Sequence, residues 1–473
     1  MRSLLSGLCF LLGACTPTQS ADLAIRGATV VDVTDGSLAV DQTVLLGGNR
    51  IVAVGPADAV RVPAGADVLE AAGGYLIPGL WDAHVHSAGN ASWHFPLYIA
   101  HGITSVRNMH TGVDDALDVV LSIERRVGAG ELLGPRFLAN GAVVDGDPPV
   151  WPGSVVVRNA EEARAAVDRL ADGGAAFIKV YDRLTPEAYL AILTRANERE
   201  VPVDGHLPLM IPPEEAAAAS QRTIEHTSGI TMGCASGAEA LRAEYVRYLE
   251  RVPEMPPYPD QMVEFLRLVR RTIDARDLER CLQAARTFRE HGVVSVPTLV
   301  VNGGGDPQAF VADERRMALL PPSVREEWRA LADSPDPTAE LLGPVAATIS
   351  ENVRVLHEEG NVILAGTDVG NPFLVPGLSL HRELERLTEA GLSPLEALQA
   401  ATLAPAQVFD LEESLGTVEM GKLADLVLLE GDPLQAISNT RRVRAVITDG
   451  RLFRRADLDR LLAEDQETEK QEE

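Results

Sequence analysis

The sequence predicts an α/β fold, a (β/α)8 TIM-like barrel with a small composite β-sandwich built from both chain ends. Two observations predict it. In the middle of the chain, eight apolar strand candidates alternate with helical stretches, which is typical of a parallel sheet. Strand-rich segments of similar texture lie near both ends. Eight strand–helix units favour a closed barrel over an open doubly wound sheet.

The two ends of the chain have the pattern of short antiparallel strands. Residues 23–69 contain β-branched runs broken by Gly-Gly or Gly-Pro, and "LADLVLLEGD" and "VRAVITDGRLF" repeat this texture late in the chain. We interpret residues 22–75 and 411–455 as the two parts of one sandwich, with the barrel, residues 76–410, inserted between them. Residues 456–473 are expected to form a charged C-terminal tail.

Eight apolar segments are the candidate barrel strands. In order they are "LIPGLWDAHVH", "GITSVRNM", "RFLANGAVV", "AAFIKVYD", "VPVDGHLP", "RTIEHTSG", "VVSVPTLVV" and "VILAGTDVG". Amphipathic helices are predicted between many of them, for example at 160–172 and 186–200. Two long connections, about 234–278 and 302–342, follow late strands and should lie over the C-terminal face, where lids are found.

The N-terminus has the features of an export signal. Residues 1–21 contain one early arginine and a short apolar run that ends in Leu12-Gly13-Ala14-Cys15, and this resembles a bacterial lipobox. Acylation of Cys15 would anchor the protein to a membrane through lipid alone. We therefore expect a periplasm-facing lipoprotein of the bacterial cell envelope; an ordinary secreted form, cut near Ala14, is the alternative.

Composition narrows the classes of partner. The formal net charge of −27 repels phosphate, so nucleic acid and anionic membrane surfaces are not expected ligands. The expected partner is a small-molecule or short-peptide substrate, and a homo-oligomer is left open. Cys234 and Cys281 could form a disulfide in an oxidising compartment, but the sequence does not show whether they meet.

The first chemical signal is His84-Val85-His86, at the end of an apolar run. Residues i and i+2 of a strand point to the same face, so both imidazoles can bind one metal ion. Chance H-x-H pairs are common, so the motif alone is a weak signal.

The second signal is Lys179, which is flanked by apolar residues in "AAFIKVYD". Burial should lower the pKa of its amine, and a neutral amine can react with carbon dioxide to give a carbamate that bridges two cations. A lysine that reaches the surface or pairs with a carboxylate is the alternative.

Three further residues end later strand candidates, namely His206, His226 and Asp368. Each alone could be a satisfied polar group in the core. The chain has only 10 histidines, however, and four of them fall at strand ends together with one lysine and one aspartate. Catalytic residues of barrels gather at that face, so the combined set predicts a metal site.

This set resembles the amidohydrolase superfamily, in its binuclear subtype with a carboxylated lysine. The family places H-x-H on strand 1, lysine on strand 4, histidines on strands 5 and 6, and aspartate on strand 8. The segments "IKVY", "GHLP", "IEH" and "GTDVGNP" further resemble the Xaa-Pro dipeptidase-like, imidazolonepropionase-related branch. The residues that match the family's metal ligands are His84, His86, Lys179, His206, His226 and Asp368.

The resemblance implies a role for each residue. His84, His86 and Asp368 would hold the more buried of two divalent metal ions, with zinc expected and manganese or cobalt left open. His206 and His226 would hold the outer ion. The carbamate of Lys179 and a hydroxide would bridge the two ions. Asp368 would act as general base and then acid.

Weaker candidates surround this set. Tyr181 shares a face with Lys179 and could bind the substrate or stabilise its oxyanion; core packing is the alternative. His381 could contact the substrate, although a helix surface is also consistent with its position. Related sequences read Arg-Asp where this chain has Arg107-Asn108, which leaves the role of that position in doubt. The remaining histidines are assigned to structure or surface: His94, His101, His110, His291 and His357.

The function expected from these residues is metal-dependent hydrolysis of a C–N amide bond in dipeptides or N-acyl amino acids. A cyclic amidase, lactonase or deaminase on the same scaffold is the alternative, because fold does not select among them. A lipoprotein that binds a ligand without turning it over is a third hypothesis, which the intact set of six residues disfavours.

Overall fold

The computed structural model describes residues 21–110, 116–256, 259–302 and 305–464. The expected signal peptide with Cys15, and the end of the charged tail, lie outside these residues. Residues 456–464 of that tail belong to helix α18 (Arg455–Glu464). Within the described ranges, no helix combines the length and the apolar character that a membrane span needs.

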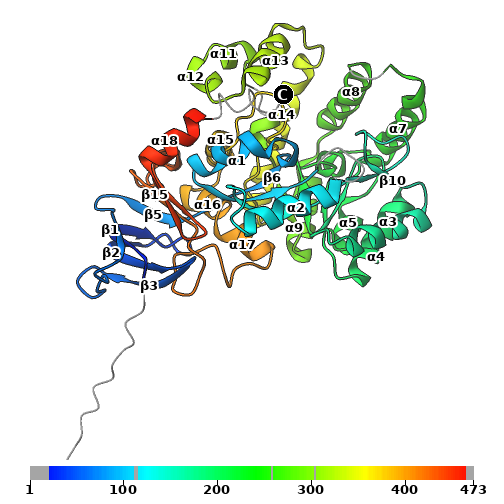
Figure 1. Ribbon diagram of the computed structural model, residues 1–473. Helices are drawn as coiled ribbons and strands as arrows, with labels where there is room; N and C mark the ends of the chain where they lie inside the picture. The colour runs from blue at the N-terminus through cyan, green and yellow to red at the C-terminus, as the bar shows by residue number, and fades with distance from the viewer. Residues whose placement is uncertain (1–20, 111–115, 257–258, 303–304, 465–473) are drawn as a thin grey trace, which may run out of the picture.

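The two chain ends form one continuous sheet (Figure 1). Its strand order is β17-β16-β15-β5-β1-β2-β3, and β4 pairs with β1. Strand β15 pairs antiparallel with β5, which joins the late part of the chain to the early part. All of these strands belong to one hydrogen-bonded sheet, and the sandwich expected from the sequence stays a prediction. The strands are β1 (Leu23–Val31), β2 (Leu38–Gly47), β3 (Arg50–Pro56), β4 (Asp67–Glu70), β5 (Tyr75–Pro78), β15 (Leu426–Leu429), β16 (Val443–Thr448) and β17 (Arg451–Arg454).

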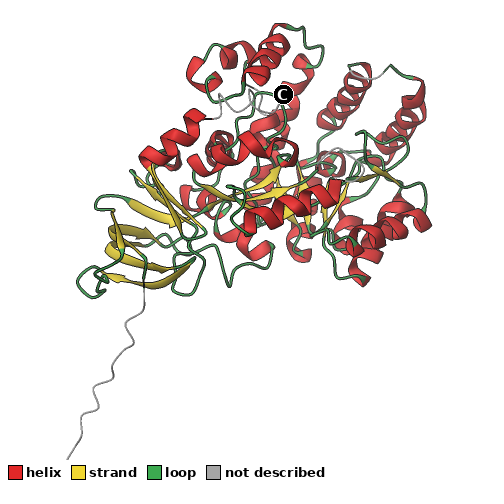
Figure 2. Cartoon of the chain, in the orientation of Figure 1, coloured by secondary structure: helices red, strands yellow, loops and turns green. Residues whose placement is uncertain are grey.

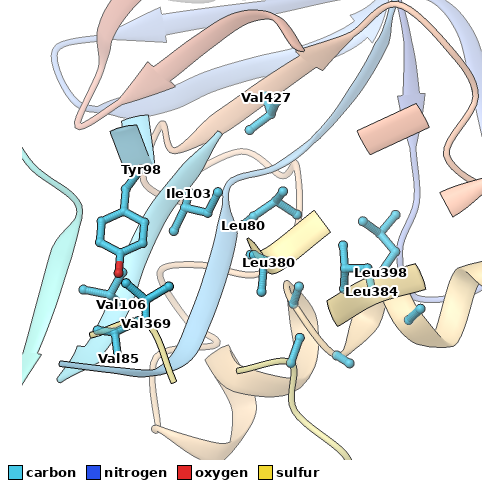
Figure 3. Close-up of a cluster of buried hydrophobic side chains, with 14 of the residues drawn as sticks. Leu80, Val85, Tyr98, Ile103, Val106, Val369, Leu380, Leu384, Leu398 and Val427 are labelled. Atoms are coloured by element: carbon cyan, nitrogen blue, oxygen red, sulfur yellow. The ribbon is translucent and has the colours of Figure 1, made fainter. Parts of the chain in front are cut away.

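Both faces of this sheet are covered where β5 meets β15. Alternate side chains of a strand point to opposite faces. Leu76 and Leu428 therefore pack into the core of the terminal sheet, whereas Ile77 and Val427 pack into the central core of the molecule. Figure 3 shows Val427 near Leu80 and Ile103, in a cluster that also contains Leu380 and Leu384. This packing fixes the terminal sheet against the rest of the chain.

The central strands are parallel and short, as Figure 2 shows among the surrounding helices. They are β6 (Leu80–Val85), β7 (Ile103–Asn108), β8 (Arg136–Ala139), β9 (Val144–Asp145), β10 (Val155–Val156), β11 (Ile178–Val180), β12 (Val203–Gly205), β13 (Thr223–Glu225) and β14 (Val294–Val296). The eighth expected strand, 362–370, contains only isolated parallel bridges, from Ile363 to Ser295 and from Val369 to Val85. These bridges place it between β14 and β6.

Helices lie between the central strands, and the two amphipathic helices predicted above are confirmed. Helix α3 (Ala160–Asp172) begins after Asn159, whose side chain accepts backbone N–H bonds. Helix α4 (Pro186–Glu198) begins after Thr185 in the same way, with proline at its first position. Other helices of this layer are α1 (Ala91–Ala100), α2 (Ala116–Gly128), α5 (Pro213–Ala218), α9 (Leu278–His291), α14 (Ala339–Glu358), α15 (Leu378–Glu389), α16 (Pro394–Gln399) and α17 (Leu403–Val408).

The two long connections fold as helical insertions, which Figure 1 shows as two separate projections. The first contains α6 (Ile230–Cys234), α7 (Ala238–Arg251) and α8 (Asp260–Asp274), and Cys234 forms a disulfide with Cys281 of α9. The second contains α11 (Pro307–Val311), α12 (Glu314–Met317) and α13 (Pro322–Asp333). Phe310 and Trp328 of this second insertion contact Phe373, which follows the eighth segment.

Candidate metal centre

The six residues expected to bind metal come from five different strand segments, and the structure brings them together in one cluster. His84 is the last but one residue of β6 and His86 directly follows that strand, while Lys179 lies in β11. His206 and His226 directly follow β12 and β13, and Asp368 lies in the eighth segment.

Asp368 lies between the imidazoles. Its Oδ1 is 2.9 Å from His86 Nε2 and 3.3 Å from His84 Nε2, and its Oδ2 is 4.0 Å from His226 Nε2. One ligand atom each from His84, His226 and Asp368 lie within 4.8 Å of one another, a spacing that could hold a metal ion. The rings of His226 and His206 are 4.8 Å apart, which extends the cluster toward Lys179 and Tyr181.

The histidines of the cluster differ in how much of their side chains is exposed. The side chain of His84 is completely buried, whereas His86 keeps 23% and His226 18% of its surface. His84 is therefore the innermost of these three imidazoles, and the cluster opens outward on the side of His86 and His226.

Each imidazole is held through its Nδ1. His84 Nδ1 is 2.7 Å from Glu225, His206 Nδ1 is 3.0 Å from Asp182, and His86 Nδ1 is 3.3 Å from the His110 carbonyl. Carboxylates and carbonyls accept hydrogen bonds, so these three imidazoles carry their proton on Nδ1 and present a lone pair at Nε2. His226 Nδ1 contacts the Thr298 hydroxyl at 2.6 Å.

Acceptors consequently face acceptors in the centre of the site. The Nε2 lone pairs of His84 and His86 point at Asp368 Oδ1, and neither His84 Nε2 nor Asp368 Oδ1 has a hydrogen-bond partner. His206 Nε2 is also buried without a partner. Buried acceptors that approach this closely need a cation between them. A proton can meet that need at one contact, and a divalent metal ion can meet it at several.

Left-handed backbone at two of these residues aims their side chains. His226 has φ 58° and Asp368 has φ 65°, a region that costs a non-glycine residue of order 1–3 kcal/mol. Simple strand alternation would send Glu225 and His226 to opposite faces. Because the chain turns at His226, both side chains lie beside His84 instead.

Lys179 is almost fully buried, with 2% of its surface exposed. Burial lowers the pKa of its amine from 10.5 to about 8, against the opposing pull of Asp368 and Glu225. Its Nζ is 5.7 Å from the centre of the Tyr181 ring. Burial therefore raises the neutral, nucleophilic fraction of the amine, which is the direction expected from the sequence.

Tyr181 lies beside the histidines. Its ring is 4.0 Å from the ring of His206, and its Oη accepts a 2.8 Å hydrogen bond from Nε1 of Trp151, whose side chain is exposed. Burial raises the pKa of Tyr181 well above 10, so its hydroxyl keeps its proton. Since Trp151 occupies an oxygen lone pair, that proton is available to another acceptor.

His381 is placed elsewhere, and this placement argues against the expected substrate contact. The side chain is fully buried, and its nitrogens lie 3.0 Å from Thr440 Oγ1 and 3.0 Å from the carbonyl of His101. It joins α15 to neighbouring segments. Proximity to Asp368 in sequence therefore does not by itself bring the His381 side chain to the metal-binding cluster.

The residues that hold the histidines were not predicted from the sequence: Glu225, Asp182, Thr298 and His110. Glu225 could have been found, because a carboxylate inside an apolar strand next to a histidine requires a buried partner. The Asn108 departure also has a structural role, since its Oδ1 accepts the backbone N–H of Ser87 at 2.8 Å and stabilises the turn after His86.

Comparison with known proteins agrees with this architecture. The family model described as "Amidohydrolase family" matches residues 75–453. An adenine deaminase from Mesorhizobium japonicum is 24% identical over 87% of this chain, and an imidazolonepropionase from Rubrobacter xylanophilus is 27% identical over 82%. The alignments cover 54% and 84% of those two proteins, so the chain spans about half the length of the adenine deaminase.

A solved structure is similar over nearly the whole chain. It is a Bifidobacterium longum protein provisionally assigned as a prolidase, 25% identical, with a TM-score of 0.66, and the match covers 94% of this chain and 98% of that one. The family match, which spans most of the chain and all of the site residues, shows that the chain belongs to the amidohydrolase family.

Proposed function

We propose that the protein is a metal-dependent hydrolase that cleaves a C–N amide bond in dipeptides or N-acyl amino acids. The observation that carries this proposal is the convergence of the Nε2 atoms of His84 and His86 on the Asp368 carboxylate. We also infer that the eight central segments close into a (β/α)8 barrel. Backbone hydrogen bonds support this inference at two places. The N–H of Ala83 in the first segment donates to the Ala365 carbonyl of the eighth, and the N–H of Ala176 in the fourth segment donates to the Ala139 carbonyl of the third.

The donor set fits divalent metal ions with nitrogen and oxygen preference, such as zinc. His84, His86 and Asp368 would hold one ion, and His206 and His226 a second. Lys179, as its carbamate, would supply oxygen ligands to both. When bound, such ions supply Lewis acidity and lower the pKa of a bound water.

The chain's own residues would move the protons. Asp368, ionised because the neighbouring His84 and His226 outweigh burial and hold its pKa well below the usual range, can accept a proton from the attacking water. It can then return that proton to the leaving amine. The Tyr181 hydroxyl can donate to the substrate carbonyl oxygen as negative charge develops there.

The similar proteins bear on the substrate class. Similarity to the Bifidobacterium protein assigned as a prolidase supports a dipeptide substrate. The relatives named adenine deaminase and imidazolonepropionase support the alternative, a deaminase or cyclic amidase. All three reactions attack an sp² carbon bonded to nitrogen, so the same residues could serve each of them.

A substrate screen decides between these classes. Purified protein with measured metal content would be offered Xaa-Pro, Xaa-Arg and Xaa-Lys dipeptides, N-acyl amino acids, cyclic amides and adenine. We expect metal-dependent release of free amino acids from the first two groups. Turnover of adenine or a cyclic amide alone would replace the proposal by the alternative, and no metal binding at all would refute both.

We also propose that the protein is exported and anchored through Cys15. The Cys234–Cys281 disulfide supports an oxidising compartment. Replacing Cys15 by serine should move the protein from the membrane fraction to the soluble fraction of the producing bacterium; unchanged fractionation would contradict the anchor.

A further inference from the structure

A buried charged network lies directly behind the candidate metal centre. Arg107, in β7, has no exposed surface. Its guanidinium donates to Ala83 O at 2.7 Å, Asp204 Oδ2 at 2.8 Å, Thr223 Oγ1 at 3.1 Å and Glu225 Oε1 at 2.8 Å. A buried charge with so many fixed partners cannot reorient without breaking several of these bonds.

The two oxygens of Glu225 face different ways. Oε1 accepts hydrogen bonds from Arg107 and from the Thr223 hydroxyl, the latter at 2.5 Å. Oε2 faces only the ring of His84, at 2.7 Å from Nδ1. Glu225 thus connects the arginine to the innermost histidine of the site.

We propose that Arg107 and Glu225 act together as a positioning pair that holds His84 in the tautomer with its proton on Nδ1. In that tautomer the Nε2 lone pair points at Asp368 and is free to bind a cation. The inference deepens the proposed function and rests on it, because it assigns a role toward the metal held by His84. Both side chains are completely buried.

The substitution Glu225→Gln should reverse this tautomer. Arg107 can only donate hydrogen bonds, so it keeps the amide oxygen of the new side chain on its own side. The amide nitrogen then faces His84 and donates to Nδ1. The imidazole proton is forced onto Nε2, where it points at Asp368 and blocks metal binding.

Asp182 offers a matched control. Its Oδ1 accepts from His206 Nδ1 at 3.0 Å, and no arginine pairs with Asp182 in the part of the chain that the structure describes. In Asp182→Asn the amide oxygen can therefore turn toward His206 and keep the same tautomer. The same change from carboxylate to amide should therefore weaken metal binding less at Asp182 than at Glu225.

The double substitution Arg107→Met with Glu225→Gln should restore metal binding in part. Without the guanidinium, the amide can turn its oxygen toward His84, and the Thr223 hydroxyl can donate or accept as needed. Asp204 keeps its two bonds to Arg222, at 2.9 and 2.6 Å, so no buried carboxylate is left unpaired.

The experiment measures zinc content by elemental analysis and zinc affinity by competition with a chelator. We expect about 10- to 100-fold weaker binding of one zinc equivalent in Glu225→Gln, a smaller loss in Asp182→Asn, and recovery in the double variant. Wild-type affinity in Glu225→Gln, or a double variant that binds no better than Glu225→Gln, would overturn the pair. A merely structural network predicts lower thermal stability without recovery of zinc.

Two further outcomes are separable. If the wild-type protein binds no zinc, manganese or cobalt, the proposed function fails, and the proposed role of Arg107 and Glu225 fails with it. If Glu225→Gln does not fold, the double variant, which carries no buried charge at either position, still tests the pair: it must bind two equivalents, and failure to do so in a folded protein overturns the inference.

Discussion

Lys179 provides the most demanding test of the site. Its amine must be neutral to react with carbon dioxide, and burial lowers its pKa from 10.5 to about 8. At pH 7 the neutral fraction is then about one in ten, roughly 300-fold more than for an ordinary lysine. Below pH 8 the ratio of ammonium to neutral amine rises about tenfold for each pH unit. Metal loading that depends on the carbamate should therefore slow as the pH falls.

The assay is metal reconstitution of the metal-free protein. Bicarbonate should accelerate the recovery of activity, with a rate that rises about tenfold between pH 7 and 9 and levels off above pH 8. The chain has only three lysines, so ¹³C-labelled bicarbonate should give one new carbamate signal, absent from Lys179→Ala. Lys422→Ala is the control, because Lys422 bonds to the Leu415 carbonyl outside the site. Full metal content and activity in Lys179→Ala, or indifference to bicarbonate, would refute the reasoning.

Three other predictions concern the pH dependence, the oxyanion donor and the disulfide. Burial lowers the pKa of His84, but Asp368 and Glu225 together raise it above 6.5. Because the proton on His84 competes with metal ions, metal affinity should fall as the pH drops from 8 to 6. Chelator titrations at both pH values check this, and equal affinities would contradict it. Tyr181→Phe should lower kcat by about 10²- to 10³-fold with little change in KM, because the Tyr181 hydroxyl acts on charge that develops in the transition state. Both constants are measured on the substrate found in the screen. A change in KM alone would show that Tyr181 contributes only to ground-state binding. Replacing Cys234 and Cys281 by alanine should lower the free energy of unfolding by about 4 kcal/mol, since the crosslink spans 47 residues of sequence. Urea denaturation measures this change. A change below about 1 kcal/mol would show that loss of the disulfide gives the unfolded chain little additional freedom.

The sequence alone was sufficient for the parts of the site that depend on local pattern. Two-residue periodicity placed His84 and His86 on one face of a strand, and an apolar run around Lys179 indicated its burial. The helices at 160–172 and 186–198 were predictable because their caps and apolar periodicity are properties of adjacent residues.

Contacts between distant residues were decided only by the tertiary structure. Glu225 meets His84 across 141 positions of sequence, and Arg107 meets Glu225 across 118. His381 contacts Thr440 and the His101 carbonyl although it lies close to Asp368 in sequence. Tautomer, exposure and the direction of a side chain are set by neighbours that chain folding brings together and by left-handed backbone at His226 and Asp368. Local residue patterns carry no information about these neighbours, which is why the strand ends could be located while the groups that orient their histidines could not.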